Sequence, residues 1–82
     1  MRNYKVHIDL VDLYEYISEF DLLEYRHLFM IVFVEAENPD NACYLVRKRI
    51  KYSIMNTNNT LRARIACRQV NLHLRIDRIE AL

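Results

Sequence analysis

The chain has 82 residues and a mass of 10.0 kDa, which is the size of one small domain spanning 1–82. It is 52% hydrophobic and 28% charged, too apolar for a disordered chain and too charged for a membrane protein, so we expect a soluble globular domain. The chain contains no glycine. Dinucleotide-binding loops, phosphate-binding loops and nucleophile elbows depend on glycine and are therefore excluded.

The formal net charge of +1 conceals a strong asymmetry between the two halves of the chain. Residues 1–40 carry three basic and nine acidic groups, a charge of −6, whereas residues 41–82 carry nine basic and two acidic groups, a charge of +7. Such asymmetry indicates either a nucleic-acid or membrane partner, or two halves whose charges face one another. We favour the second interpretation, because the halves of so small a domain must pack together.

The cysteine content and the start of the chain predict a cellular compartment. Cys43 and Cys67 are twenty-four residues apart and have no second pair with which to form a zinc site. The first five residues lack the apolar core of a secretory signal, and the longest apolar run, 28–34, has seven residues against the roughly 20 of a membrane span. We therefore expect reduced thiols, no membrane partner and a cytoplasmic location.

The predicted elements begin with a half-buried strand over residues 4–10. Apolar residues alternate there with polar ones, at Tyr4, Val6, Ile8 and Leu10. From Asp12 the apolar spacing becomes helical, and Asp12 followed by Glu15 has the form of a capping box, which predicts a short helix over about 13–24. A strand is the alternative for this segment, because tyrosine-rich stretches also suit strands.

The strongest strand pattern runs from Arg26 to Glu37 and is apolar on both faces. One face carries Leu28, Met30, Val32, Val34 and Ala36. The other face carries Phe29, Ile31 and Phe33. A strand of this kind is typical of the middle of a sheet that is covered on both sides.

Residues 39–55 have the clearest helical pattern. Asn38 is a favourable N-cap, Pro39 suits the first helical position, and Asp40 favours the positive end of the helix dipole. The buried stripe is predicted at Ala42, Leu45, Val46, Ile50, Ser53 and Ile54. The run 56–59, Asn-Thr-Asn-Asn, is expected to end the helix and make the turn, because asparagine tolerates the left-handed conformation.

The last third of the chain shows two alternating patterns that are out of phase. Apolar residues occupy odd positions over 61–67 and even positions over 70–76. This predicts either one long strand over about 61–79, with a bulge near Arg68 and Gln69, or two short strands. The complete order predicts a compact α+β domain with a mostly antiparallel sheet of three or four strands.

One good helix covers only one face of such a sheet, so the face that carries Phe29, Ile31 and Phe33 needs a second cover. Either the segment 13–24 or a second copy of the protein supplies it. A marginal core is expected for so short a chain, and association is a common supplement.

The stretch from Val32 to Ala42, Val-Phe-Val-Glu-Ala-Glu-Asn-Pro-Asp-Asn-Ala, runs from a strand into an amphipathic helix. It resembles small uncharacterised α+β proteins of phage and environmental genomes, in which a hairpin leads into a helix and a closing basic strand. The resemblance covers about residues 27–55 and implies a strand-strand-helix-strand order. It implies no activity, cofactor or catalytic residue.

The three histidines suggest a metal site, because His7 and Asp9 would share one strand face, as would His73 and Asp77. No pair of ligands, His27 included, has the spacing of a zinc enzyme or of a structural zinc site. Exposed strand histidines that pair with carboxylates explain the same residues. We therefore expect no metal and no cofactor.

Nucleophilic catalysis has three candidate residues in this chain. Cys43 lies in the first turns of the predicted helix, which is mildly favourable for a thiolate, but we interpret it as a small hydrophobic residue. Ser18 and Ser53 do not lie in turns that would expose a nucleophile. We therefore expect no catalytic residue and no enzymatic activity.

The favoured function is a non-enzymatic interaction or accessory domain that self-associates as a dimer or larger through Phe29, Ile31 and Phe33. The alternative is a nucleic-acid-binding accessory module, in which the aromatic strand lies beside a strand rich in arginine. Its phosphate-binding residues would be Arg62, Arg64, Arg68, Arg75 and Arg78. The missing glycines and a pI of about 7.8 count against this alternative.

Overall fold

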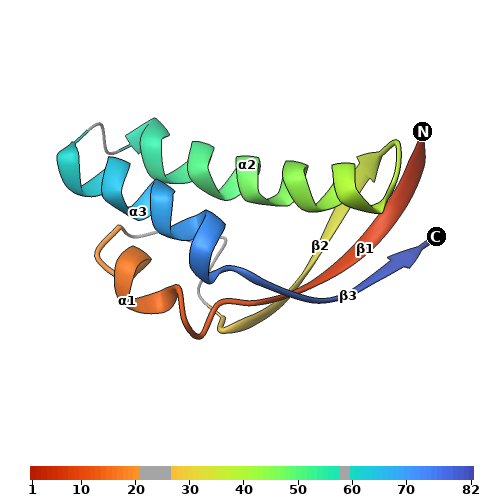
Figure 1. Ribbon diagram of the computed structural model, residues 1–82, viewed down its shortest axis with the longest axis horizontal. Helices are drawn as coiled ribbons and strands as arrows, with labels where there is room; N and C mark the ends of the chain where they lie inside the picture. The colour runs from red at the N-terminus through yellow and green to blue at the C-terminus, as the bar shows by residue number, and fades with distance from the viewer. Residues whose placement is uncertain (21–26, 58–59) are drawn as a thin grey trace.

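The computed structural model contains a three-stranded antiparallel sheet and two long helices, as Figure 1 shows. The structure describes residues 1–20, 27–57 and 60–82. In chain order the elements are β1 (Arg2–Asp9), α1 (Tyr14–Ile17), β2 (Phe29–Ala36), α2 (Pro39–Thr57), α3 (Leu61–His73) and β3 (Arg75–Ala81). The predicted α+β class with a mostly antiparallel sheet and one main helix is confirmed.

The sheet has the order β2-β1-β3, so β1 is its central strand. Tyr4, Val6 and Ile8 are buried, which confirms the strand predicted over residues 4–10. Both neighbours run antiparallel to β1. The register between β1 and β3 shifts between His7 and Ile8, so Asp77 has no opposite residue on β1 and forms a bulge in β3.

The helix predicted over 13–24 is present as the single turn α1, and residues 21–24 of that prediction lie outside the described residues. The predicted capping box is wrong, because Leu13 occupies the N-cap position and no side chain caps the helix. The Asp9 carboxylate instead stabilises the turn that precedes α1, where it accepts a hydrogen bond from the main-chain N–H of Val11 at 2.8 Å. Leu13, Ile17 and Phe20 are buried, which holds α1 against α3.

The prediction that the strand over 26–37 lies in the middle of a doubly covered sheet is wrong. Among the residues that the structure describes, β2 pairs with β1 alone and is an edge strand. Its two faces alternate as predicted, with Val32 and Val34 buried under α2 and the alternate residues exposed on the other face. One apolar face of β2 is therefore buried under α2, and the other is left exposed by the rest of the described chain.

The helix predicted over 39–55 is confirmed as α2, which extends to Thr57. The side-chain oxygen of Asn38 accepts a hydrogen bond from the main-chain N–H of Asn41 at 2.8 Å, as an N-cap does. Its buried stripe consists of Ala42, Val46, Ile50 and Ile54, with Leu45 half-buried beside it. Asn56 belongs to α2, and the rest of the predicted turn at 58–59 lies outside the described residues.

The strand structure predicted over about 61–79 is wrong for residues 61–73, which form α3, and right for residues 75–79, which lie in β3. The Thr60 hydroxyl caps this helix by accepting a hydrogen bond from the main-chain N–H of Ala63 at 3.2 Å. Ala63, Ala66 and Val70 form its buried stripe. Ala63 occupies an odd position, whereas Ala66 and Val70 occupy even ones. A helical stripe with spacings of three and four therefore looks in the sequence like two alternating patterns that are out of phase.

α2 crosses one face of the sheet over β2 and β1 and continues beyond it, where it packs against α3 (Figure 1). Ile76 and Ile79 on β3 are therefore only half-buried. No helix of the described residues lies against the opposite face of the sheet, which we call the outer face. α2 and the outer face thus lie on opposite sides of the sheet, and α3 lies beyond the sheet against α2, which positions the candidate sites described next.

Candidate functional site

Three apolar side chains of β2 form a row on the outer face of the sheet. Phe29 is 65% exposed, Ile31 47% and Phe33 60%. Because successive strand residues point to opposite faces, the alternation that buries Val32 and Val34 directs these three outward. We call Phe29, Ile31 and Phe33 the apolar row. They were predicted as the self-association face, and β2 brings them together.

Beside the apolar row, β1 contributes a charged column to the outer face. In the register of the sheet, Lys5 lies opposite Phe33, His7 opposite Ile31 and Asp9 opposite Phe29. All three residues of this column are half-buried. Strand β3 adds a third column, in which Glu80 lies opposite Lys5, Arg78 opposite His7 and Arg75 opposite Asp9.

The β1 and β3 columns are joined by a polar network centred on Glu80. The carboxylate Oε2 lies 2.8 Å from His7 Nε2, 3.6 Å from Arg78 Nη2 and 4.0 Å from Lys5 Nζ. The hydrogen bond to His7, together with the positive charges of Arg78 and Lys5, lowers the pKa of the Glu80 carboxyl below its ordinary value. The outer face is therefore apolar along β2 and ionic along β1 and β3.

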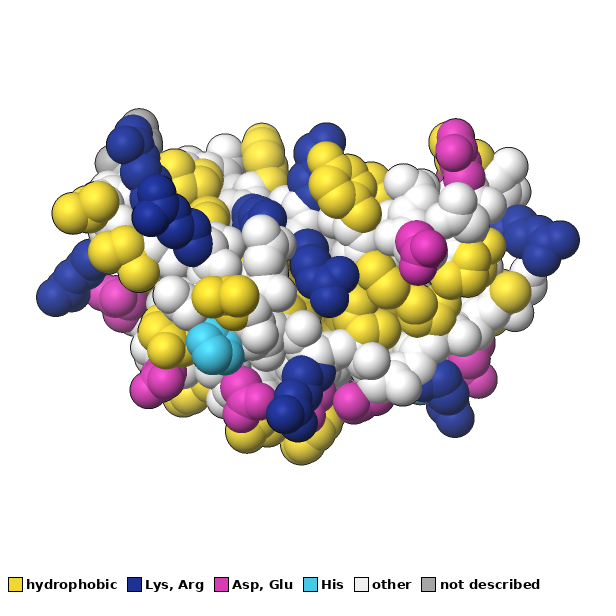
Figure 2. Space-filling model, viewed as in Figure 1, with side chains coloured by type: hydrophobic (Ala, Val, Ile, Leu, Met, Phe, Trp, Pro, Cys, Tyr) yellow, Lys and Arg dark blue, Asp and Glu magenta, His cyan; other side chains and the backbone are white. Residues whose placement is uncertain are grey.

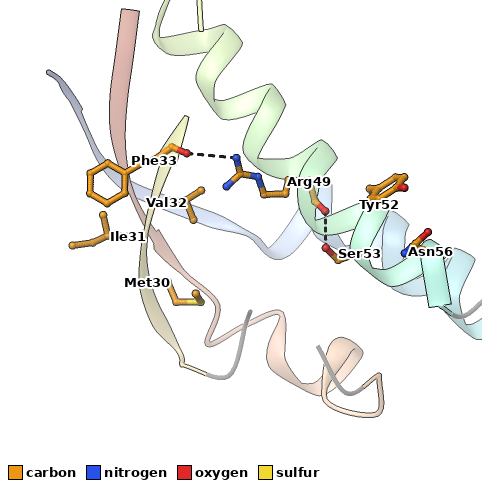
Figure 3. Close-up of a pocket in the computed structure, with 8 residues that line it drawn as sticks. All are labelled: Met30, Ile31, Val32, Phe33, Arg49, Tyr52, Ser53 and Asn56. Atoms are coloured by element: carbon orange, nitrogen blue, oxygen red, sulfur yellow. Dashed lines mark hydrogen bonds between the residues drawn. The ribbon is translucent and has the colours of Figure 1, made fainter. Parts of the chain in front are cut away.

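A groove of about 640 Å³ follows the free edge of β2 against α2 (Figure 3). The Arg49 side chain crosses this groove, and its Nη2 donates a hydrogen bond to the main-chain oxygen of Phe33 at 3.5 Å. Ser53 Oγ donates a hydrogen bond to the main-chain oxygen of Arg49 at 3.1 Å. In Figure 3, Ile31 and Phe33 point away from the groove. A charged side chain over a free strand edge hinders the pairing of that edge with another strand.

The five arginines of the nucleic-acid alternative do not form one surface. Arg62, Arg64 and Arg68 lie on α3, because that segment is a helix, whereas Arg75 and Arg78 lie on β3. Arg62 pairs with Glu19 at 3.0 Å and Arg75 with Asp12 at 3.2 Å, so two of them pair with the acidic half. Of the five, Arg75 and Arg78 share the outer face with the apolar row, and β1 separates them from it.

Sequence reasoning missed a basic surface on α2 and α3. Together the two helices contain seven basic residues and one acidic residue, Asp40. In Figure 2, Lys and Arg side chains lie across the two helices, and acidic side chains lie mainly along the lower margin and near the start of α2. The sequence signal for this surface is the run Arg47-Lys48-Arg49-x-Lys51.

A cleft of about 290 Å³ lies between α2 and α3 within this surface. It is lined by Asp40, Tyr44, Arg47, Lys48, Lys51 and Asn71. Lys48 Nζ lies 5.9 Å from the centre of the Tyr44 ring, within the range of a cation–π contact. The cleft therefore combines an exposed aromatic ring with cationic groups.

Among the described residues, no group of three histidine, cysteine or acidic side chains is arranged to hold a metal ion. His7 belongs to the Glu80 network, and the His73 ring stacks on Tyr16 with ring centres 5.1 Å apart. Cys43 and Cys67 are both free thiols. Burial raises the pKa of the Cys67 thiol, against the opposing effect of Lys51, so this cysteine is not activated as a nucleophile.

No family model, no curated protein and no solved structure matches this chain. The resemblance to small phage proteins therefore stays a prediction. In the part of the chain that the structure describes, none of the helices combines the length and the apolar character needed to cross a membrane.

Proposed function

We propose that this chain is a non-enzymatic interaction domain that self-associates, with the outer face of its sheet packed against the same face of a second copy. The observation that carries this proposal is the apolar row, in which three large side chains of one strand are exposed on a face that no described element covers. Contiguous exposed apolar surface on a small protein marks an interaction site.

The size of the row suits the centre of an interface between two copies. With exposures of 65% and 60%, Phe29 and Phe33 each present roughly 100–150 Å² of surface. The row as a whole presents on the order of 300 Å², against about 800 Å² per partner in a standard interface. The ionic columns of β1 and β3 would supply the rest as a polar rim.

The pattern of the row is self-complementary. In a symmetric dimer, residue i of one copy contacts residue j of the other, and j contacts i. We place the two-fold axis in the plane of the interface, perpendicular to the strands and level with Ile31. Rotation about this axis places Phe29 over Phe33 of the second copy and Ile31 over its own equivalent. Because the row is Phe-Ile-Phe, each ring then meets a ring.

The charges of the outer face follow the same symmetry. The axis that passes Ile31 also passes His7, so it places Lys5 over Asp9 of the second copy and Asp9 over its Lys5. In the third column it places Glu80 over Arg75 of the second copy. Arg78, near the axis, faces its own equivalent and is paired with Glu80 within its own chain. Opposite charges that meet in this way favour one orientation of the two copies.

Light scattering on the purified protein at micromolar concentration tests the proposal. We expect a mass of about twice 10.0 kDa for the unaltered chain and a monomer for Phe33→Glu, because the variant would bury a charge in the centre of the interface. Leu72→Glu is the matched control, because Leu72 is 73% exposed on α3, away from the outer face. A monomeric unaltered protein, or equal masses for the two variants, would contradict it.

The alternative function, nucleic-acid binding by Arg62, Arg64, Arg68, Arg75 and Arg78 acting together with the aromatic strand, has less support. The α3 arginines lie on a helix that packs against α2 beyond the sheet, away from the outer face that carries the apolar row. A single nucleic-acid strand bound over the outer face would therefore not reach Arg62, Arg64 or Arg68.

A further inference from the structure

We propose that the helix pair α2–α3 binds single-stranded nucleic acid through a basic surface that is separate from the self-association face. We define this basic surface as Arg47, Lys48 and Lys51 of α2 with Arg64 and Arg68 of α3. It shares only Arg64 and Arg68 with the set predicted from the sequence. The proposal goes beyond self-association and does not depend on it.

Helical spacing places these five residues on two stripes, one that lines the cleft from α2 and one on α3 that reaches the cleft at Asn71. On α2, Tyr44, Arg47, Lys48 and Lys51 have spacings of three, four and seven and all line the cleft. On α3, Arg64 and Arg68 share a stripe with Asn71, which lines the cleft from the other side. The two helices also touch between these stripes, where the Cys67 thiol donates to the main-chain oxygen of Lys51 at 3.6 Å.

The basic surface forms no ion pair with the acidic groups that the structure describes, and Asp40 is the one described acidic residue that lines its cleft. Arg62, Arg75 and Arg78 each form an ion pair within 4.0 Å, whereas the five basic-surface residues form none with a described acidic residue. The helix pair holds seven of the twelve basic residues of the chain and one of its eleven acidic residues. Such a concentration of cations attracts a polyanion and releases its counterions on binding.

Tyr44 favours a single strand over a duplex. Its side chain is 58% exposed, and its ring lies among the cationic groups of the cleft. An unpaired base can stack on such a ring while the neighbouring phosphates contact Arg47 and Lys51. In a duplex the faces of the bases are covered by their neighbours, so the same ring would contribute little.

The basic surface stays accessible in the proposed dimer. α2 lies on the side of the sheet opposite the apolar row, and α3 packs against it beyond the sheet (Figure 1). Two copies packed by their outer faces would therefore leave both helix pairs exposed. Variants of the two surfaces therefore separate the two proposals. A change in the apolar row alters the mass of the assembly, and a change in the basic surface alters binding at constant mass.

Fluorescence anisotropy with a labelled oligothymidylate of about 12 nucleotides tests the inference. We expect micromolar binding at about 50 mM salt that weakens by at least ten-fold at about 200 mM. The double variant Arg47→Gln with Lys51→Gln should bind at least about ten-fold more weakly and show a shallower dependence on salt. Tyr44→Leu should weaken binding several-fold and leave the salt dependence unchanged, since it removes stacking and no charge.

The matched control is the double variant Arg2→Gln with Arg62→Gln, which changes the net charge equally at residues outside both the basic surface and the outer face, one exposed on β1 and one paired with Glu19. We expect its affinity to stay within about two-fold of the unaltered protein. Circular dichroism melting shows whether each variant is folded, and only variants with an unchanged melting temperature are compared.

Four outcomes would overturn the inference. One is the absence of binding up to roughly 100 μM protein at about 50 mM salt. Another is an equal loss in the two double variants, which would show an effect of net charge alone. Equal affinity for a duplex of the same length, together with no effect of Tyr44→Leu on binding, would exclude a single-strand site. Binding to phosphatidylserine vesicles without binding to the oligonucleotide would assign the surface to membranes.

Discussion

Arg49 and Phe33 are joined across the free edge of the sheet, where the Arg49 guanidinium donates a hydrogen bond to the main-chain oxygen of Phe33 at 3.5 Å. This contact links α2 to the middle of an edge strand that is eight residues long and contains no proline. Edge strands of this kind pair readily with other chains unless a charge or a covering element prevents it. We therefore expect Arg49 to hinder the pairing of this edge with another chain.

We predict that Arg49→Ala increases association beyond the dimer. The substitution frees the carbonyl of Phe33 and removes the positive charge from the groove, so the edges of different molecules can pair. Sedimentation velocity over a range of concentrations should show larger species that the unaltered protein lacks. Arg64→Ala removes the same charge on α3 and should leave the size distribution unchanged. Identical distributions for Arg49→Ala and the unaltered protein would show that the guanidinium does not protect the edge.

We predict that Asn38→Ala lowers the free energy of unfolding by about 1 kcal/mol. The side-chain oxygen of Asn38 satisfies the main-chain N–H of Asn41, and alanine leaves that donor without a partner in the protein. Urea unfolding measures the change. Asn38→Ser keeps an acceptor at the same position and should retain most of the stability. A variant with alanine as stable as the unaltered protein would mean that the cap contributes nothing.

The lowered pKa of Glu80 predicts a specific dependence of stability on pH. A carboxyl whose pKa is lower in the folded than in the unfolded state stabilises the fold above its unfolded pKa, and this contribution is lost as the pH falls through the folded pKa. Glu80 is held ionised chiefly by His7, with Arg78 and Lys5 adding to the effect. Glu80→Gln should therefore be less stable than the unaltered protein near neutral pH, with the difference shrinking in acid.

Urea unfolding at about pH 7, 5, 4 and 3 follows this difference through the ordinary range of carboxyl titration. Glu15→Gln is the control, because Glu15 is exposed on α1 outside the network. A difference between Glu80→Gln and the unaltered protein that stays constant down to the lowest pH would be incompatible with the network as described.

The sheet and α2 could be predicted because their local signals agree with their environment. Alternation over residues 4–10 and the sequence Asn38-Pro39 each point to the element that forms. The edge position of β2 could not be predicted, because apolar residues on both faces of a strand ordinarily mean burial on both sides. What distinguishes this strand is an apolar face that the described chain leaves exposed, and the sequence pattern of such a face is the same as that of a buried one.

α3 was missed because exposed apolar residues concealed its buried stripe. Leu61, Ile65 and Leu72 are exposed, and with the buried residues they complete two false alternations. The stripe itself consists of Ala63, Ala66 and Val70, which are small and weakly hydrophobic. The basic surface could not be found without this helix, because Arg64 and Arg68 join Lys51 only when residues 61–73 are helical.

A mixing experiment with two charge variants tests the central claim, that two copies associate by their outer faces about a two-fold axis. Lys5→Glu places two acidic groups against each other in the dimer, and Asp9→Lys places two basic groups against each other, so each variant alone should be a monomer near 10.0 kDa by light scattering. In a mixed dimer the new acidic group at position 5 of one variant faces the new basic group at position 9 of the other, and the unaltered Asp9 faces the unaltered Lys5. Every contact between these positions then joins opposite charges. We predict that the mixture forms a heterodimer of about twice that mass, whereas a mixture that stays monomeric while both variants remain folded would contradict the proposed arrangement.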